Sequence, residues 1–213
     1  MLSPRAYMCT VLTEYGILDT KRKKPHFSAR ATMGHVVLTA PPKTGKTTAC
    51  RRFIEEHRND SGVCMGGFLR IDQDLVDVST DAHFPFLCRR DAMDPSADPN
   101  EYVPVGSNKC LRRAVFDRAN AIYDAFVGRE MGRNSVFFLD EFGLLERERG
   151  GHYELARKCV TSPFRTVFVV RDHCLPTFLA DFGGLGRRFV VLSVTVENRD
   201  SIPSQMAALL EKR

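Results

Sequence analysis

Residues 40–47 have the sequence Ala-Pro-Pro-Lys-Thr-Gly-Lys-Thr and follow a short apolar run at 35–39. This pattern is typical of a loop that binds phosphate. Successive backbone N–H groups and the positive end of the following helix can surround the α- and β-phosphates of a nucleotide. Gly45 permits this close approach because it has no Cβ. We expect the Lys46 ammonium to contact the β/γ oxygens and the Thr47 hydroxyl to ligate Mg²⁺. The predicted nucleotide-binding residues of the loop are Ala40, Pro41, Pro42, Lys43, Thr44, Gly45, Lys46, Thr47 and Thr48.

A second candidate for chemistry is the apolar run at 136–139 (Val-Phe-Phe-Leu), which Asp140 and Glu141 follow directly. Four consecutive apolar residues suit a strand that is buried on both faces of a parallel sheet. Two carboxylates after such a strand are expected at its carboxyl edge, where ligands bind in open α/β sheets. Downstream of a phosphate-binding loop, Asp140 is predicted to hold Mg²⁺ through water, and Glu141 to polarise the attacking water as a general base.

Arg171 and Asp172 follow a third apolar run, at 166–170. They too fall at the carboxyl end of a predicted strand, which is a place for a group that senses a γ-phosphate. A structural salt bridge explains the same residues equally well. The His and Cys residues do not have the spacing of a zinc site, and the Gly-x-Ser-x-Gly of a serine hydrolase does not occur.

Hydrophobic periodicity indicates the elements that must position these residues. Strands are predicted at 35–39, 63–71, 75–78, 102–105, 136–139, 166–170 and 189–194, with an interruption at Gly66-Gly67 and a hairpin between the second and third. Helices are predicted at 47–57, at 111–126 (closed by Gly128), at 153–160, at 176–182 and from Pro203 onward. Residues 89–100 are predicted to be an exposed loop and 143–150 a solvated helix end. The alternation indicates an α/β fold with a mainly parallel, doubly wound sheet.

The chain has 213 residues and a formal net charge of +5, which suits one globular domain. Much of the positive charge lies in residues 1–32, including the Lys-Arg-Lys-Lys cluster at 21–24, and the remainder is near balance. No nucleic-acid footprint is therefore predicted for the domain, which is expected at 33–213. Residues 1–32 are interpreted as a basic N-terminal extension, disordered or the result of a mis-assigned start. A solvated tail, a targeting presequence and a translation start at Met33 all remain open.

No run of about 18 apolar residues occurs, so no membrane-spanning helix is predicted. The seven cysteines form no Cys-x-x-Cys pair, and several fall in apolar segments. Buried, reduced thiols in a cytoplasmic protein are the expected interpretation.

Several motifs occur together in the chain. Besides the loop at 40–48, residues 66–68 read Gly-Gly-Phe, residues 140–143 read Asp-Glu-Phe-Gly, and residues 194–200 read Val-Thr-Val-Glu-Asn-Arg-Asp. Together they resemble the small P-loop nucleoside-triphosphatase family, which includes the animal cancer-related nucleoside-triphosphatase and thermophile relatives. The family's counterparts are Gly-Pro-Pro-Gly-x-Gly-Lys-Thr-Thr, a Gly-Phe strand, Asp-Glu-Ile-Gly and Val-Thr-x-Glu-Asn-Arg-Asp. The similarity spans residues 33–213.

The resemblance implies a RecA-like sheet in which one strand separates the strand ending at Asp140 from the strand before the loop. It also implies slow, Mg²⁺-dependent hydrolysis of several nucleoside triphosphates (ATP, GTP, CTP and UTP). Asn198 and Arg199 would, by the same analogy, lie near the base. Two departures are visible, because Ala40 and Lys43 replace loop glycines of the family, which is expected to alter affinity or rate. The strand after the Gly-Phe element is shorter than is usual in the family, so its hairpin is expected to differ.

The function that the sequence favours is hydrolysis of nucleoside triphosphates to diphosphate and phosphate. The catalytic residues would be Lys46 and Glu141, and the metal ligands Thr47 and Asp140. One alternative is a kinase that uses the same loop with the arginines of a lid, for which Arg112-Arg113 and Arg187-Arg188 are available. Another is a non-catalytic nucleotide switch. Glu141 argues against a kinase, because kinases rarely place a carboxylate to orient water. The sequence gives no indication of the oligomeric state.

Overall fold

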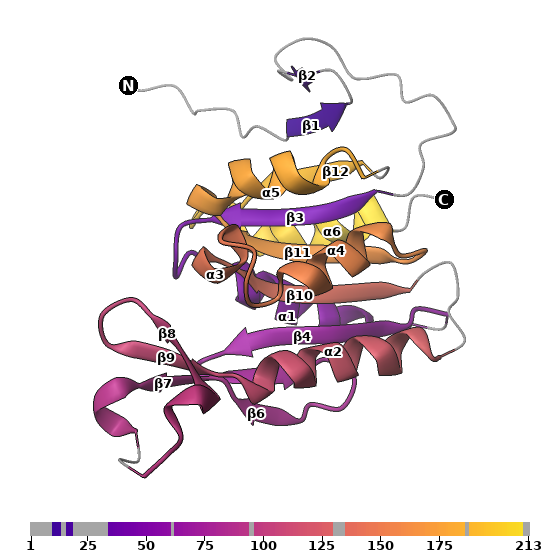
Figure 1. Cartoon of the computed structure of the whole chain (residues 1–213). Helices are drawn as coiled ribbons and strands as arrows, with labels where there is room; N and C mark the ends of the chain where they lie inside the picture. The colour runs from indigo at the N-terminus through magenta and orange to yellow at the C-terminus, as the bar shows by residue number, and fades with distance from the viewer. Residues whose placement is uncertain are drawn as a thin grey trace.

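The computed structural model describes residues 10–13, 16–18, 34–60, 62–93, 96–129, 135–185 and 188–210, with the backbone alone for the first two segments. The elements follow in chain order (Figure 1): β1 (Thr10–Thr13), β2 (Gly16–Leu18), β3 (His35–Ala40), α1 (Lys46–His57), β4 (Met65–Ile71), β5 (Asp74–Asp77), β6 (His83–Pro85), β7 (Leu87–Arg89), β8 (Tyr102–Val105), β9 (Lys109–Arg112), α2 (Ala114–Val127), β10 (Val136–Phe142), α3 (Leu144–Arg147), α4 (Tyr153–Thr161), β11 (Arg165–Arg171), α5 (Leu175–Phe182), β12 (Phe189–Ser193) and α6 (Ile202–Leu210). Short 3₁₀ turns lie at Arg90–Ala92, Pro99–Glu101, Asp172–Cys174 and Arg199–Ser201.

The main sheet runs through the whole molecule (Figure 1). In the described part of the chain its strand order is β2-β1-β12-β3-β11-β10-β4-β5-β6. The central strands from β12 to β4 are parallel, and the strands added at both edges are antiparallel. β11 separates β3, which precedes the phosphate-binding loop, from β10, which carries Asp140 and Glu141. The predicted order is confirmed, and parallel pairing brings both segments to the same edge of the sheet.

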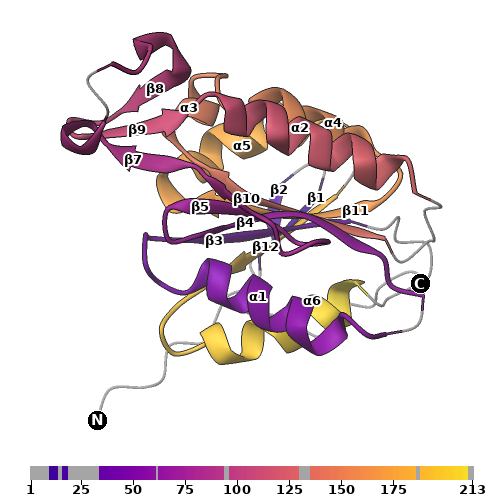
Figure 2. The same cartoon turned by 90° about the horizontal axis from the view of Figure 1, so that it is seen from below.

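Helices cover both faces of this sheet (Figure 2). α1 and α6 pack on one face, and α2, α4 and α5 pack on the other. The apolar positions that recur at helical spacing are buried, namely Ala49, Cys50, Phe53 and Ile54 of α1 and Val115, Ala119, Ile122 and Phe126 of α2. The doubly wound α/β fold is therefore confirmed, with one apolar core on each side of the sheet.

The glycines of β4 allow close packing and do not interrupt the strand. A Cβ at Gly66 would overlap the ring of Phe126 in α2, and a Cβ at Gly67, where φ is 102°, would overlap the backbone of Phe138 in β10. β4 runs unbroken through both glycines, so the predicted interruption is wrong. The hairpin to β5 is confirmed, and its turn contains Asp72 at φ 54°, a conformation that Asp adopts more readily than most residues.

The segment between β6 and α2 forms a small sheet, β7-β9-β8. The sequence predicts only β8 of these strands, in which Pro104 is exposed. Leu111 pairs within β9, and the helix begins later than predicted, at Ala114. The predicted helix end is confirmed, since Gly128 is the C-cap of α2. Figures 1 and 2 place the small sheet at the end of the molecule where the loop between β3 and α1 lies.

The predicted solvated helix end at 143–150 is wrong at Glu146. This side chain of α3 is 3% exposed, and its carboxylate accepts hydrogen bonds from the backbone N–H groups of Gly143 (2.8 Å) and His152 (2.9 Å). Burial raises the pKa of the Glu146 carboxyl, and the hydrogen bonds act in the opposite direction. Glu146 thereby joins the two ends of the connection from β10 to α4 and fixes the chain just after Glu141.

Some predictions for the chain as a whole fall partly outside the described residues. β1 pairs with β12 and β2 with β1, and the other residues of the predicted extension at 1–32 are not described. Cys9 also lies outside the described residues, and the cysteines at 50, 64, 88, 110, 159 and 174 carry free thiols. Among the helices that the structure describes, none is long and apolar enough to cross a membrane.

Candidate active site

The predicted phosphate-binding loop joins the centre of the sheet to the N-terminus of α1 (Figure 2). Ala40 ends β3 and is buried. Lys43 and Gly45 have φ values of 62° and 108°, in the left-handed region. Left-handed residues within a turn create the concave arrays of backbone N–H groups that bind anions. The Thr44 hydroxyl braces the turn by donating to the carbonyl of Pro41 at 2.8 Å. The loop therefore has the backbone of an anion-binding site.

Lys46, the first residue of α1, lies over this loop. Its Nζ donates hydrogen bonds to the carbonyl oxygens of Ala40 (2.7 Å) and Pro41 (2.9 Å). Burial lowers the pKa of the half-buried ammonium, while the neighbouring carboxylates act to raise it. The cation is thus held by two carbonyls, which phosphate oxygens can replace. The other predicted binding residues of the loop, Pro42 and Thr48, are exposed.

Thr47 and Asp140, the predicted metal ligands, are in direct contact. The Thr47 hydroxyl donates to Oδ2 of Asp140 at 2.7 Å, and the backbone N–H of Arg70 donates to the same oxygen at 3.1 Å. Asp140 is 3% exposed, and this burial raises its pKa to about 6, although both hydrogen bonds favour the charged form. A buried carboxylate beside a hydroxyl is an oxygen-only donor set, which Mg²⁺ prefers. The residues present therefore fit the predicted Mg²⁺ site.

A β-bulge separates the two carboxylates of β10. Asp140 pairs with Val169 of β11 and Phe142 pairs with the next residue, Val170, so Glu141 is an extra residue in the strand. Its φ of 106° is rare for residues other than glycine. Phe142 packs on the face of the sheet that α5 covers. In a regular strand, residue 141 would point to that face and residue 142 to the opposite one. The bulge thus releases the Glu141 side chain from the core and leaves it at the carboxyl edge.

Two arginines hold the Glu141 carboxylate. Nη1 of Arg70 in β4 donates to Oε2 at 3.1 Å, and Nη2 of Arg171 in β11 donates to Oε1. β4 and β11 are the neighbours of β10 on its two sides, so the sheet order brings the three side chains together. Arg171 therefore forms the salt bridge that is one of its two predicted roles. Asp172 is exposed in the turn that follows.

The two guanidinium groups determine the ionisation of Glu141. Burial acts to raise the pKa of Glu141, but the charges and hydrogen bonds of Arg70 and Arg171 outweigh it, and the pKa lies below the ordinary value. The carboxylate is therefore ionised at neutral pH. Sequence reasoning missed Arg70, whose signal is a cation inside the otherwise apolar run 68–71 (Phe-Leu-Arg-Ile). A half-buried charge in such a strand requires a partner of opposite charge on a neighbouring strand.

Asn198 and Arg199 lie in the turn between β12 and α6. The Asn198 side chain accepts a hydrogen bond from the N–H of Thr195 (2.7 Å) and donates one to the carbonyl of Ser193 (2.9 Å). Arg199 adjoins the phosphate-binding loop, because a Cβ at Gly45 would come within 3.2 Å of the Arg199 Cδ. Arg199 is thus placed beside the loop, and Asn198 shapes the turn that carries it.

The arginines considered for a lid have other contacts. Nε of Arg113 donates to the carbonyl of Asn100 at 2.9 Å, and the Arg112 guanidinium lies 5.8 Å from the centroid of the Tyr102 ring. Arg113 therefore contacts the 3₁₀ turn before β8, and Arg112 contacts β8 itself. Of the second pair, Arg187 lies outside the described residues and Arg188 precedes β12.

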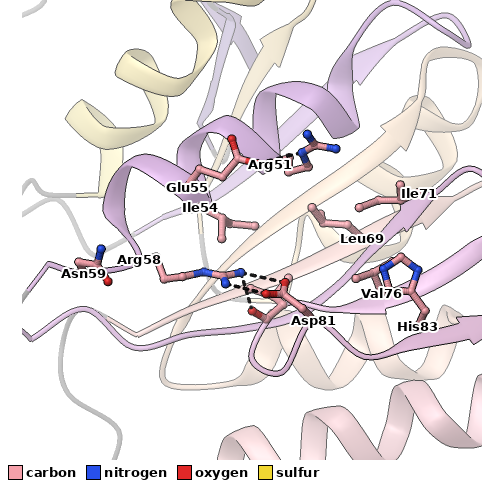
Figure 3. Close-up of a pocket in the computed structure, with 11 residues that line it drawn as sticks. Arg51, Ile54, Glu55, Arg58, Asn59, Leu69, Ile71, Val76, Asp81 and His83 are labelled. Atoms are coloured by element: carbon pink, nitrogen blue, oxygen red, sulfur yellow. Dashed lines mark hydrogen bonds and ion pairs between the residues drawn. The ribbon is translucent and has the colours of Figure 1, made fainter.

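A separate groove lies between α1 and the strands β4 and β5 (Figure 3). It encloses about 390 Å³, and its apolar lining residues are Ile54, Leu69, Ile71, Val76 and Val78. Arg58 donates to both carboxylate oxygens of Asp81 there, at 2.7 and 3.0 Å. Of the described residues that line this groove, none belongs to the loop at 40–45 or to β10. The groove is therefore distinct from the candidate active site.

Comparison with solved structures finds the same fold in two proteins. The solution structure of a human cancer-related nucleoside triphosphatase matches with a TM-score of 0.63 and 21% identity, over 84% of this chain and 97% of that chain. The crystal structure of THEP1 from the hyperthermophile Aquifex aeolicus matches with a TM-score of 0.61 and 20% identity, over 83% of this chain and 99% of that chain. No protein-family model matches the chain, and no curated protein matches its sequence. The resemblance to the small P-loop nucleoside-triphosphatases is thereby confirmed at the level of the fold.

Proposed function

We propose that this protein hydrolyses nucleoside triphosphates to diphosphate and phosphate with Mg²⁺ as cofactor. The observation that carries the proposal is the contact between Thr47, at the start of α1, and Asp140 in β10, with Glu141 held at the same edge by the bulge. A phosphate-binding loop, a fitting metal site and a carboxylate that can act on water are thus combined. The fold shared with a human nucleoside triphosphatase supports the proposal.

Binding would use the loop and its neighbours. Lys46 would exchange its two carbonyl partners for phosphate oxygens, and the backbone N–H groups of the loop would surround the β-phosphate. Thr47 and Asp140 would hold Mg²⁺, which, when bound, neutralises charge on the phosphates. Arg199 would contact the nucleotide, since it adjoins the loop, and Asn198 would fix its turn.

Glu141 would act on the attacking water. An ionised carboxylate accepts a hydrogen bond from water and can align the water oxygen with the γ-phosphorus. Its lowered pKa makes Glu141 a weaker base than an ordinary glutamate. That lowering applies while both arginines hold the carboxylate, and we assign to Glu141 both the orientation of the water and acceptance of its proton. The same carboxylate disfavours a kinase, in which an acceptor hydroxyl must replace water.

The breadth of the substrate range is proposed from the family resemblance alone: slow turnover of ATP, GTP, CTP and UTP. A cytoplasmic location is proposed because the described cysteines carry free thiols.

Phosphate release from the four nucleotides, measured with Mg²⁺ and with EDTA, tests the function. Lys46→Ala should abolish both MgATP binding and release while the protein stays folded. Lys158→Ala, which changes an exposed lysine of α4, is the matched control and should behave like wild type. Wild-type release by Lys46→Ala would show that the site is wrongly assigned. Transfer of phosphate only to an added acceptor would favour the kinase, and binding without release would favour the switch.

A further inference from the structure

We propose that Arg70 and Arg171 are catalytic groups that leave Glu141 for the γ-phosphate when a nucleotide binds, so that this chain supplies its own positive charge to the transition state. The inference rests on the proposed function and adds two residues to it. Many nucleoside triphosphatases take such an arginine from a partner protein. Here two guanidinium groups already lie at the carboxyl edge, one on each neighbour of β10.

The ion pairs lie next to the phosphate and metal sites. The backbone N–H of Arg70 donates to Asp140, and its guanidinium donates to Glu141 one residue further along β10. Arg171 lies close enough to Lys46 for the charges of the two side chains to repel each other. Both arginines are therefore anchored around the place where the γ-phosphate must lie to meet Lys46 and the metal ligands.

The guanidinium groups also remain open to a ligand. The side chains of Arg70 and Arg171 are 28% and 29% exposed, more than the 18% of Glu141 between them. Gly143 leaves space at Arg171, because a Cβ there would come within 3.2 Å of the Arg171 Nε and 3.5 Å of its Cζ. Both guanidinium groups are thus accessible to an incoming phosphate, and Arg171 has space beside Gly143 in which to turn.

The charges at this edge favour the exchange. Three cations face three carboxylates, namely Lys46, Arg70 and Arg171 against Asp140, Glu141 and Asp172. A γ-phosphate beside the ionised Glu141 adds negative charge that Lys46 alone does not balance. Guanidinium groups bind phosphate and carboxylate in the same forked geometry, so each arginine can change partners while it keeps its hydrogen bonds.

The exchange would leave Glu141 free to bind water. During hydrolysis the water oxygen bonds to the γ-phosphorus, and the bond to the bridging oxygen breaks with its electron pair going to the diphosphate. One water proton passes to Glu141. The arginines would stabilise the negative charge that spreads over the γ-phosphoryl oxygens, an effect that is worth about 10³–10⁵ in turnover where one arginine finger is added to other enzymes.

Arg70→Gln and Arg171→Gln, each in the full chain, test the inference. We expect each to lower phosphate release at least ~100-fold, on the scale of losing one donor to a transition state. The affinity for MgADP should change little, while capture of MgADP with aluminium fluoride, a mimic of the transition state, should be lost. Arg58→Gln, which breaks an ion pair of the separate groove in Figure 3, should match wild type in both measurements.

A role limited to holding Glu141 predicts a different result in the Glu141→Gln background. There, adding Arg70→Gln should still weaken aluminium fluoride capture if the arginine contacts phosphate. Because Glu141 is already replaced in this background, the second substitution leaves no carboxylate at position 141 without its partner. No further weakening would overturn the inference, as would wild-type release by both single arginine variants. A wild-type protein that releases no phosphate would instead overturn the proposed function, and this inference with it.

Discussion

Asp140→Asn should stabilise the nucleotide-free protein while it destroys activity. The carboxyl is buried, and this burial raises its pKa in the folded protein to about 6, from the ordinary value of 3.8 that holds in an unfolded chain. The folded state therefore binds the proton more tightly than the unfolded state. The contribution of this carboxyl to the free energy of unfolding is fully present below pH 3.8 and is lost as the pH rises through 6.

Compared with a side chain that stays neutral, this difference in pKa lowers the free energy of unfolding by about 3 kcal/mol at pH 7.5. At pH 5 the loss is about half as large. Asparagine has the shape of the protonated carboxyl and can still accept hydrogen bonds from Thr47 and Arg70, but it carries no charge to desolvate. The free energy of unfolding of Asp140→Asn should therefore exceed that of wild type by about 2–3 kcal/mol at pH 7.5, with a smaller excess at pH 5.

Urea denaturation at both pH values, without Mg²⁺ or nucleotide, measures the difference. Asp172→Asn is the control, because Asp172 is exposed and its pKa is lowered, so no gain is expected. MgATP at 1,000 times its Kd should reverse the ranking, since a ligand at that concentration stabilises wild type by about 4.1 kcal/mol. A loss of stability in Asp140→Asn, or a gain that does not depend on pH, would refute the conclusion that burial of the Asp140 charge destabilises the fold.

Three further outcomes are expected. Glu141→Gln should lower phosphate release at least ~100-fold and tighten MgATP binding, because one negative charge beside the γ-phosphate is removed; unchanged release would exclude Glu141 from the mechanism. Lys43→Gly should relieve roughly 1 kcal/mol of backbone strain in the folded state, because Lys43 has a left-handed conformation. Glycine also raises the conformational entropy of the unfolded chain, so the net free energy of unfolding should change by less than about 1 kcal/mol. A larger loss in urea denaturation would mean that the Lys43 side chain stabilises the loop. Glu146→Ala should cost roughly 2–4 kcal/mol by leaving two buried N–H groups without an acceptor. Glu146→Gln keeps an acceptor and should lose less stability than Glu146→Ala. Equal decreases in the melting temperature of the two variants would contradict a role of Glu146 as hydrogen-bond acceptor.

The sequence predicts those parts of the site that have a local signal. The loop at 40–48 is recognisable alone, and the apolar run before Asp140 becomes informative downstream of that loop, because buried parallel strands end at one edge of a sheet whatever their order. The contacts of Glu141 have no such signal. Its pairing with Arg70 depends on β4 lying beside β10, and its release from the core depends on a bulge that the sequence Asp-Glu-Phe does not announce.

The other differences have a similar physical origin. β7 and β9, the strands of the small sheet that the sequence does not predict, read Leu-Cys-Arg and Lys-Cys-Leu-Arg, and neither alternates apolar and polar residues with a period of two. Glu146 lies in a charged run, and charge favours solvent, but two backbone N–H groups without other partners provide a buried place for its carboxylate. In the small sheet the pairing of strands outweighs local preference, and at Glu146 hydrogen bonds to residues three and six positions away do so.

The bulge at Glu141 also bears on how such a protein could have arisen. Without residue 141, Phe142 would follow Asp140 directly and would occupy the face of the sheet on which it already packs, so the strand would alternate regularly and the core would not need to change. The carboxylate that we propose to act on water is, in this sense, an insertion into a complete strand. An ancestor that bound nucleotides without hydrolysing them could therefore acquire this carboxylate by the gain of one codon, and a descendant could lose it in the same way, with the fold inherited intact.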